Sequence, residues 1–287
     1  MISIVTAYYN RKQLFINTLK SIKAQNSTYL LEVIAVDDGS EETERLEDLV
    51  SEFPFLKVIR LEKRNKWYHN SCIPFNIGFN AAKGDKIIIQ NPECFHYGNI
   101  LEYTAKNLTQ NAYLSFGCFS LDKPSTKSID EIFTDRSIAQ IIEKNNDFAK
   151  NDGDAGWYNH SVYRPKAYHF CTAISKKDLH TLGGFDELFA LGIAYDDDEF
   201  LSRIKKKKLK ILFIDDELVL HQNHYNPDSP SFQNRAHKMH LMVRNQRLLE
   251  RFSKTNDYKA NIISKFMGLN LKKYYIKIVL NIIERVK

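Results

Sequence analysis

Four consecutive carboxylates, Asp196 to Glu199, form the densest group of acidic side chains in the sequence. Carboxylates repel one another, but the start of a helix tolerates them, because free backbone N–H groups and the positive end of the helix dipole favour negative charge there. Apolar residues follow at helical spacing and predict a helix that begins at this run. Taken alone, the run is most simply an acidic first turn with a Glu199–Arg203 pair.

The residues before the run change that interpretation. A Gly-Gly pair allows a sharp bend, and Phe-Asp-Glu follows it, so the stretch Gly183–Arg203 has a definite internal pattern. This stretch resembles the acidic segment of inverting glycosyltransferases with the GT-A fold, especially family 2 and the related galactosyl- and N-acetylgalactosaminyltransferases. The resemblance implies that Asp197 is the catalytic base, which takes a proton from an acceptor hydroxyl. It also implies that Asp196 and Gly184 lie beside the donor or acceptor sugar.

Two expected strand ends carry residues suited to a nucleobase. Thr6, Ala7 and Tyr8 come at the end of the first expected strand, and Asp38 follows the second. An aromatic ring can stack on a pyrimidine while a carboxylate accepts the ring N–H, and the resemblance places these two groups at Tyr8 and Asp38. Alone, the sequence Asp-Asp-Gly-Ser is merely a turn. In combination with the acidic segment, we interpret these residues as the nucleotide site for a UDP-sugar.

The segment Asn91-Pro92-Glu93 follows the fourth expected strand. Most members of the resembled family have Asp-x-Asp here, and its last acidic side chain binds a divalent metal under the diphosphate. This chain keeps only Glu93 at that position. In the family a histidine after a later strand completes the site, and His221 aligns best, with His224 in reserve. A carboxylate and a neutral imidazole suit Mn²⁺, and the carboxylate also suits Mg²⁺. Whether a metal is required stays open.

The segment from 150 to 172 is an expected loop that is rich in aromatic residues. Aromatic faces stack against the C–H side of sugars, so this loop is a candidate sugar surface, with Trp157 as the preferred contact. Packing under a long loop explains any single one of these aromatic residues nearly as well.

The net charge of +6 is unevenly spread, because residues 258–287 alone contribute +6. The rest of the chain is nearly neutral, which argues against a nucleic-acid enzyme with a basic groove. The four cysteines form no C-x-x-C pair, so we expect them to be reduced and structural. No stretch is long and apolar enough for a membrane span, and the first residues lack the pattern of a secretory signal. We therefore expect the protein in the cytoplasm.

Strands alternate with helices over the first hundred residues. This alternation predicts an α/β fold with a mostly parallel, twisted sheet flanked by helices, whose ligands bind beyond the carboxyl ends of the strands. Asn10 is the expected cap of a helix that runs to about Gln25, and Glu41, Glu42 and Glu44 are expected in the first turn of another. The expected strands lie at 2–7, 31–36, 57–61, 86–90 and 211–216, the last of which leads through 217–220 to His221, and a further helix lies around 71–83.

The chain is predicted to consist of a GT-A domain, residues 1–255, and a basic amphipathic helical tail, residues 256–287. The tail has apolar residues at helical spacing and lysines beside them. Such a helix can lie in an anionic membrane surface, which would place the protein peripherally on the inner face of the membrane. The alternative is a helix packed on the domain or on a partner chain. The apolar positions are Ile262, Phe266, Leu269, Ile276, Leu280 and Ile283.

The motifs together predict an inverting glycosyltransferase. Its donor is a UDP-sugar, with UDP-galactose, UDP-N-acetylgalactosamine and UDP-glucose as the candidates. Its acceptor is a hydroxyl of a glycan or a lipid-linked saccharide in surface polysaccharide synthesis. The alternative is a catalytically silent GT-A domain that binds a glycan or a partner protein, since the acids that normally precede Glu93 are missing. Retention of Asp197 and His221 argues against this alternative.

Overall fold

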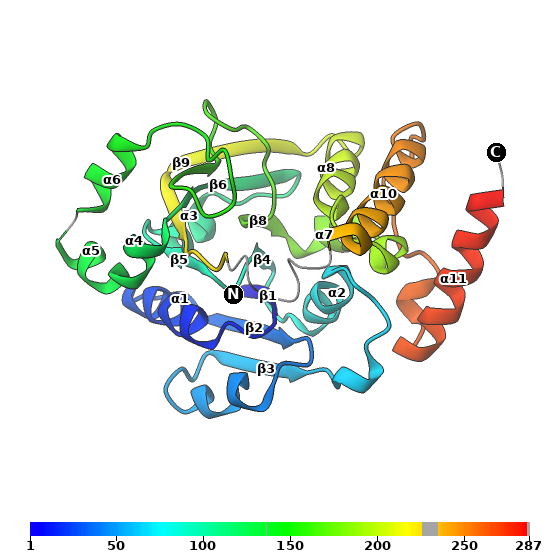
Figure 1. The fold of residues 1–287 in the computed structure, drawn as a ribbon, viewed down its shortest axis with the longest axis horizontal. Coiled ribbons are helices and arrows are strands. Elements are labelled where there is room, and N and C mark those ends of the chain that lie inside the picture. Colours follow the sequence, from blue (N-terminus) through cyan, green and yellow to red (C-terminus); the bar gives the residue numbers. More distant parts are fainter. Residues whose placement is uncertain (136, 226–234, 286–287) are drawn as a thin grey trace.

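A computed structural model describes residues 1–135, 137–225 and 235–285. One curled sheet crosses the molecule and helices flank it (Figure 1), which confirms the predicted α/β class. The strand order is β3-β2-β1-β4-β8-β6-β9-β5, and β7 pairs with β6. The strands are β1 (Ile2–Tyr8), β2 (Leu31–Asp37), β3 (Leu56–Arg60), β4 (Lys86–Gln90), β5 (Cys94–His96), β6 (Ala112–Ser120), β7 (Gly156–Asn159), β8 (Cys171–Ser175) and β9 (Lys210–His221).

The first four strands of the sheet order, β3-β2-β1-β4, are parallel, as predicted. The sheet is mixed beyond them, because β8 is antiparallel to both β4 and β6, whereas β9 is parallel to β6. Each strand pair also fixes which strand ends meet at the same edge. The carboxyl ends of β1, β2, β4, β6 and β9 and the start of β8 therefore lie along one edge of the sheet.

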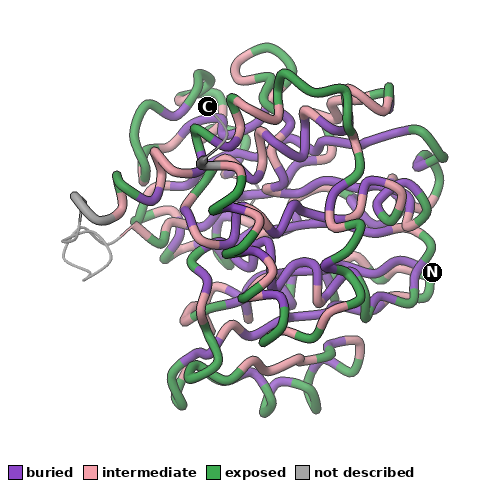
Figure 2. The backbone as a smooth tube through the Cα atoms, turned by 90° about the vertical axis from the view of Figure 1, so that its right-hand side faces the viewer, coloured by how far each residue is buried: buried purple, intermediate pink, exposed green. Residues whose placement is uncertain are grey.

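Helices cover both faces of the sheet. Side chains alternate along β1, so that Ile4 packs toward α1 (Lys12–Ala24) and Val5 packs toward α2 (Cys72–Ala81). The buried residues run through the strands at the centre of the molecule (Figure 2). The remaining helices are α3 (Ile100–Asn107), α4 (Lys123–Lys127), α5 (Ile129–Asp135), α6 (Ile138–Lys144), α7 (Lys176–Leu182), α8 (Asp196–Lys206), α10 (Arg235–Phe252) and α11 (Leu269–Arg285).

Two local predictions about helix starts are wrong. Helix α1 begins at Lys12 after Arg11, because Asn10 adopts a positive φ of 47° and its side chain accepts a hydrogen bond from the backbone N–H of Glu41. The helix expected after Ser40 is replaced by two short 3₁₀ turns, η1 (Glu42–Glu44) and η2 (Glu47–Val50). Further 3₁₀ segments, η3 (Lys63–Asn65), η4 (Glu187–Leu191) and η5 (Ser264–Phe266), lie later in the chain.

The C-terminal helix α11 packs against the rest of the protein. Ile276 and Leu280 are fully buried and share an apolar cluster with Phe189 of η4 and Leu248 of α10. The side chain of Lys272 forms an ion pair with Glu187. One face of the predicted tail therefore belongs to the same core as the preceding helices. The last two residues of the tail lie outside the described residues.

The acidic segment starts α8 as predicted, and the pair Glu199–Arg203 anchors that helix. The two side chains are bonded at 2.6 Å and nearly fully buried, and the guanidinium also donates to the carbonyl oxygens of Leu182 and Gly184. These hydrogen bonds hold the Gly-Gly bend, residues 183–184, against α8. Gly184 adopts a φ of 71°, a left-handed conformation that glycine adopts without steric cost.

We predict that Glu199→Ala lowers the free energy of unfolding by about 3–5 kcal/mol, because it leaves the buried Arg203 cation without its partner. Urea denaturation followed by circular dichroism would measure this loss. Glu102→Ala is the matched control, since Glu102 and Lys106 form a pair at the same helical spacing that is more than half exposed. This control is expected to change stability by less than about 0.5 kcal/mol. Equal effects of the two substitutions would contradict the assignment.

Candidate active site

Glu93 lies deeply buried at the strand-end edge, with 1% of its surface exposed. Three side chains reach its carboxylate from two other segments of the chain. Arg11, just before α1, donates to Oε2 at 2.8 Å. His221 and His224, at and after the end of β9, place their Nε2 atoms 3.1 and 3.2 Å from Oε1. The structure thus brings together Glu93 and both predicted histidines.

The electrostatics of this cluster favour an ionised carboxylate and a neutral imidazole. Burial alone would raise the pKa of Glu93, but Arg11 and the two histidines outweigh burial and hold this pKa well below its usual value. Burial lowers the pKa of His221, against the opposing effect of Glu93. The Nδ1 atom of His221 is buried without a hydrogen-bond partner.

These residues fit a divalent metal. The donor atoms of Glu93, His221 and His224 lie within 4.8 Å of one another, and one carboxylate with two imidazoles is a ligand set that suits Mn²⁺. The resemblance implied Glu93 with His221, and His224 in reserve, and the structure places both histidines at this carboxylate. Arg11, which the sequence analysis did not identify, holds the other oxygen of the same carboxylate.

A buried glutamine holds the metal-site segments in register. The backbone N–H and the side-chain Nε2 of Gln222 both donate to the carbonyl oxygen of Glu93, each at 3.1 Å. Its side chain also bonds Asn17 and the carbonyl of Leu14 on α1. The β4–β5 turn, the end of β9 and α1 are therefore tied together next to the carboxylate. Gln222 carries no catalytic signature in the sequence, and only its contacts identify it.

A pocket of about 330 Å³ opens in front of Glu93. Its walls come from α1, the β4–β5 turn, the aromatic loop and the end of β9. Several of the lining side chains are polar and can bind a phosphate or a sugar. One of them, the guanidinium of Arg164, lies over the ring of Tyr158. The lining residues are Arg11, Asn91, Glu93, Ser120, Asp152, Gly153, Tyr158, Arg164, Phe170, His221, Asn223, His224 and Tyr225.

The predicted base Asp197 is 31% exposed and paired with a buried histidine. Nδ1 of His169 contacts its Oδ1 atom, and the next residue, Phe170, lines the Glu93 pocket. Asp197 is not buried against Arg203, which pairs with Glu199 instead. The segment that precedes β8 therefore connects the acidic start of α8 with the metal-site pocket.

Asp196, the residue before Asp197, is buried. Asn70 donates a hydrogen bond of 2.8 Å to its Oδ1 atom. Burial, followed by the charge of Asp197, raises the pKa of Asp196 to about 6. Burial would lower the pKa of His169, but the two carboxylates outweigh burial and raise it. The ligand atoms of these three groups lie within 4.8 Å of one another.

The two strand ends predicted to hold the nucleobase lie side by side, but the ring of Tyr8 is not available to stack on a base. Tyr8 is fully buried: its ring packs on Phe15, and its hydroxyl donates to the backbone carbonyl of Glu44. It has no free face for a base. Thr6 is also buried, and Ala7 is half-buried.

Asp38 occupies the expected position next to β1, since its backbone N–H donates to the carbonyl of Tyr8. Lys66 and the Tyr68 hydroxyl each bond its carboxylate at 2.5 Å. The exposed ring in this region is that of Tyr9, and Nζ of Lys66 lies 5.0 Å from its centroid. The aromatic group that is available beside Asp38 is therefore Tyr9.

Two predicted sugar contacts are wrong. Trp157 is 4% exposed, and its Nε1 donates to Asn146 while its ring packs against Phe119 and His160. It belongs to a core rather than to an open surface. A Cβ atom at Gly184 would lie 2.4 Å from Oδ1 of Asn76, so this glycine is packed against α2. The aromatic residues of this loop that line the pocket are the neighbouring Tyr158 and, further along, Phe170.

Comparison with known proteins agrees with this geometry. Residues 3–163 match Glycosyl transferase family 2, which is more than half of the chain. The chain belongs to that family, and it is a glycosyltransferase with the GT-A fold. Chondroitin synthase of Escherichia coli is 25% identical over 249 residues, an alignment that covers 77% of this chain and 34% of that protein. The chain thus spans about a third of the length of this relative.

Solved structures share the fold at low identity. The 1–349 fragment of S. aureus TarS in complex with UDP has a TM-score of 0.56 and 13% identity, covering 98% of this chain and 70% of that chain. The mannosyltransferase PcManGT of Pyrobaculum calidifontis, in complex with GDP-Man and Mn²⁺, has a TM-score of 0.52 and 16% identity, covering 97% of this chain and 70% of that chain.

We predict that Asp196→Asn stabilises the protein at high pH. A carboxyl whose pKa is raised on folding loses stability as pH rises through the interval from its ordinary value to about 6. The neutral amide removes this loss and retains an acceptor for Asn70. The gain should be roughly 1–3 kcal/mol at pH 8 and should vanish near pH 4. Urea denaturation at the two pH values measures the gain, and an equal effect at both would contradict a buried, proton-binding Asp196.

Proposed function

We propose that this protein transfers a sugar from a UDP-sugar to an acceptor hydroxyl with inversion at the anomeric carbon, and that Asp197 is the general base. The observation that carries this proposal is the placement of Asp197. Asp197 is a partly exposed carboxylate in contact with the buried His169. The residue after this histidine, Phe170, lines the Glu93 pocket. The complexes of TarS with UDP and of PcManGT with GDP-Man support a nucleotide-linked donor.

The proposed step is a single displacement. The acceptor oxygen attacks the anomeric carbon as Asp197 takes its proton, and the bond to the diphosphate oxygen breaks with its electron pair on that oxygen. His169 holds the base in place through the contact of its Nδ1 with Oδ1 of Asp197. The buried Asp196 supports this arrangement, because Asn70 fixes its carboxylate with a hydrogen bond. Attack from the face opposite the leaving group inverts the anomeric centre.

The donor would lie along the strand-end edge. Tyr9 offers an exposed ring for the uracil, and Asp38 offers an acceptor for its N–H. Arg11 and Arg164 supply positive charge for the diphosphate. Glu93, His221 and His224 would hold Mn²⁺ or Mg²⁺, and the Mn²⁺ complex of PcManGT supports this assignment. When bound, the metal would stabilise the negative charge that develops on the leaving diphosphate.

The acceptor we propose is a hydroxyl of a glycan or of a lipid-linked saccharide. The match to chondroitin synthase, which extends over a third of that protein, supports a saccharide acceptor in surface polysaccharide synthesis. The pocket beside Glu93 is polar, with hydroxyl, amide and guanidinium groups suited to sugar hydroxyls. We place this reaction in the cytoplasm. Within the described residues, no helix is long and apolar enough to cross a membrane.

We predict that Asp197→Asn lowers turnover by roughly 10²–10⁴-fold while donor binding is retained. The amide keeps the size of the side chain but cannot accept the proton. UDP release across a panel of UDP-sugars and saccharide acceptors, with and without Mn²⁺, measures turnover, and calorimetry measures UDP binding. Turnover that survives the substitution would refute the base. A wild type that binds UDP but never turns over would favour the silent binding module.

We also predict that Glu93→Gln weakens Mn²⁺ binding by more than about tenfold. The substitution replaces a charged ligand by a neutral one of the same shape. His96→Gln is the control, because His96 is fully buried and bonds Gln90 and Gln25, away from the metal group. Electron paramagnetic resonance of free Mn²⁺ during titration gives the affinities. Unchanged Mn²⁺ affinity in Glu93→Gln would contradict the assignment of a metal site to Glu93.

A further inference from the structure

Helix α11 presents an apolar stripe to solvent. Leu271, Tyr274, Ile278 and Ile282 are 65%, 64%, 60% and 58% exposed. Their spacing of three, four and four residues places them on one face of the helix. The opposite face carries the fully buried Ile276 and Leu280. The stripe is therefore an outer surface of a helix that is already packed on its inner side.

The exposed apolar residues of this protein are concentrated in one region. Of the fifteen large apolar side chains that are exposed in the described residues, seven lie between Ile262 and Ile282. Phe266, just before α11, is 82% exposed. Exposed apolar residues that are scattered singly need no explanation, but a concentration in one segment indicates an interaction surface.

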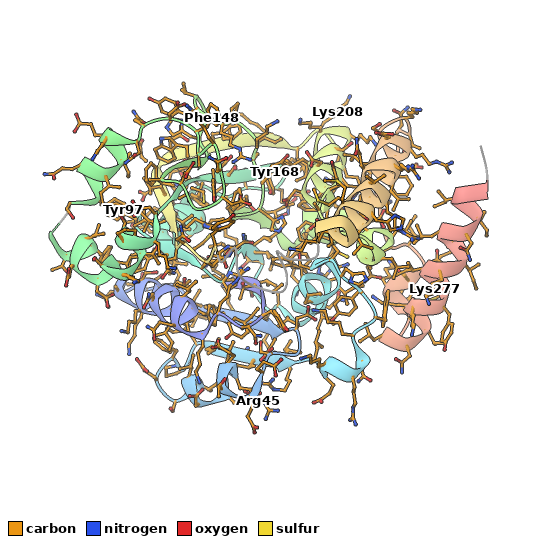
Figure 3. All side chains as sticks on the ribbon, viewed as in Figure 1. Arg45, Tyr97, Phe148, Tyr168, Lys208 and Lys277 are labelled. Atoms are coloured by element: carbon orange, nitrogen blue, oxygen red, sulfur yellow. The ribbon has the colours of Figure 1, made fainter. Side chains whose placement is uncertain are left out.

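Positive charge accompanies the stripe. Lys265, Lys273 and Lys277 form no ion pair within the described part of the chain, and Lys277 lies on α11 at the side of the molecule (Figure 3).

We propose that the outer face of α11, together with η5, docks on an anionic lipid bilayer. The apolar stripe would enter the boundary between headgroups and acyl chains, and the cations would lie at the level of the lipid phosphates. Each nearby cation contributes about 1 kcal/mol to such binding. The described helices include none that could span a bilayer, so the helix would lie along the surface.

A second copy of the chain fits this surface less well. In a twofold dimer the same face meets itself, so the lysines of one copy would approach those of the other. Few carboxylates are available beside the described part of α11 to compensate these lysines. Glu187 of η4 already forms an ion pair with Lys272. An anionic bilayer matches both the apolar and the cationic parts of the face.

Vesicle flotation tests this proposal without any enzymatic reaction. Vesicles of phosphatidylcholine with 30% phosphatidylglycerol are compared with pure phosphatidylcholine vesicles. We expect the protein to float with the anionic vesicles and to be released by salt. Leu271→Glu/Ile278→Glu and Lys273→Glu/Lys277→Glu should each lower the bound-to-free ratio by about tenfold or more. Leu30→Glu is the control, because Leu30 is 75% exposed and lies at the start of β2, on a different part of the chain.

Circular dichroism and UDP binding establish whether the variants are folded, and we expect them to fold because Leu271 and Ile278 are more than half exposed. Equal binding to neutral and anionic vesicles, or none to either, would overturn the proposal. Light scattering that shows a dimer in the wild type and a monomer in Leu271→Glu/Ile278→Glu would assign the face to a second copy instead, and would equally overturn it.

Discussion

The buried carboxylate of Glu93 is the constraint on which the site depends. A charge at 1% exposure is stable only when partners compensate it, and Arg11, His221 and His224 do so from segments far apart in the chain. Gln222 fixes the same segments through hydrogen bonds. The requirement to satisfy this group therefore holds the start of α1, the β4–β5 turn and the end of β9 together. It does so at the edge where five strands end.

The start of α8 shows a similar balance. Four acidic residues begin this helix, and each meets a different partner: Asp196 has Asn70, Asp197 has His169, Asp198 has Tyr168, and Glu199 has Arg203. The two residues before the helix, Ala194 and Tyr195, have positive φ values of 58° and 65°. This strained turn is held by the side chain of Asn245, which donates to the carbonyl of Ala194. The strain and the raised pKa of Asp196 support the proposal that this segment is part of the active site.

The sequence predicts the elements and motifs better than the individual side chains. The parallel strands, α2, α8 and the acidic run follow from periodicity and from local residue types. The prediction that Tyr8 stacks on the base is wrong because successive side chains of a strand point to opposite faces. Its ring therefore points into the core, whereas Tyr9, one residue later, is exposed. Trp157 fails because β7 pairs with β6 and thereby buries it. Arg11 and His169 act through contacts with residues distant in sequence, which no local pattern reveals.

The most direct test of the account is a crystal structure of the protein with UDP and Mn²⁺. We expect one anomalous peak bonded to Glu93 and to at least one of His221 and His224. The uracil should lie against Tyr9 and Asp38, and Asp197 should face the space beyond the diphosphate. A diphosphate bound away from Glu93, or an Asp197 side chain turned away from the bound nucleotide with no room for a sugar between them, would contradict the convergence of these residues on one active site.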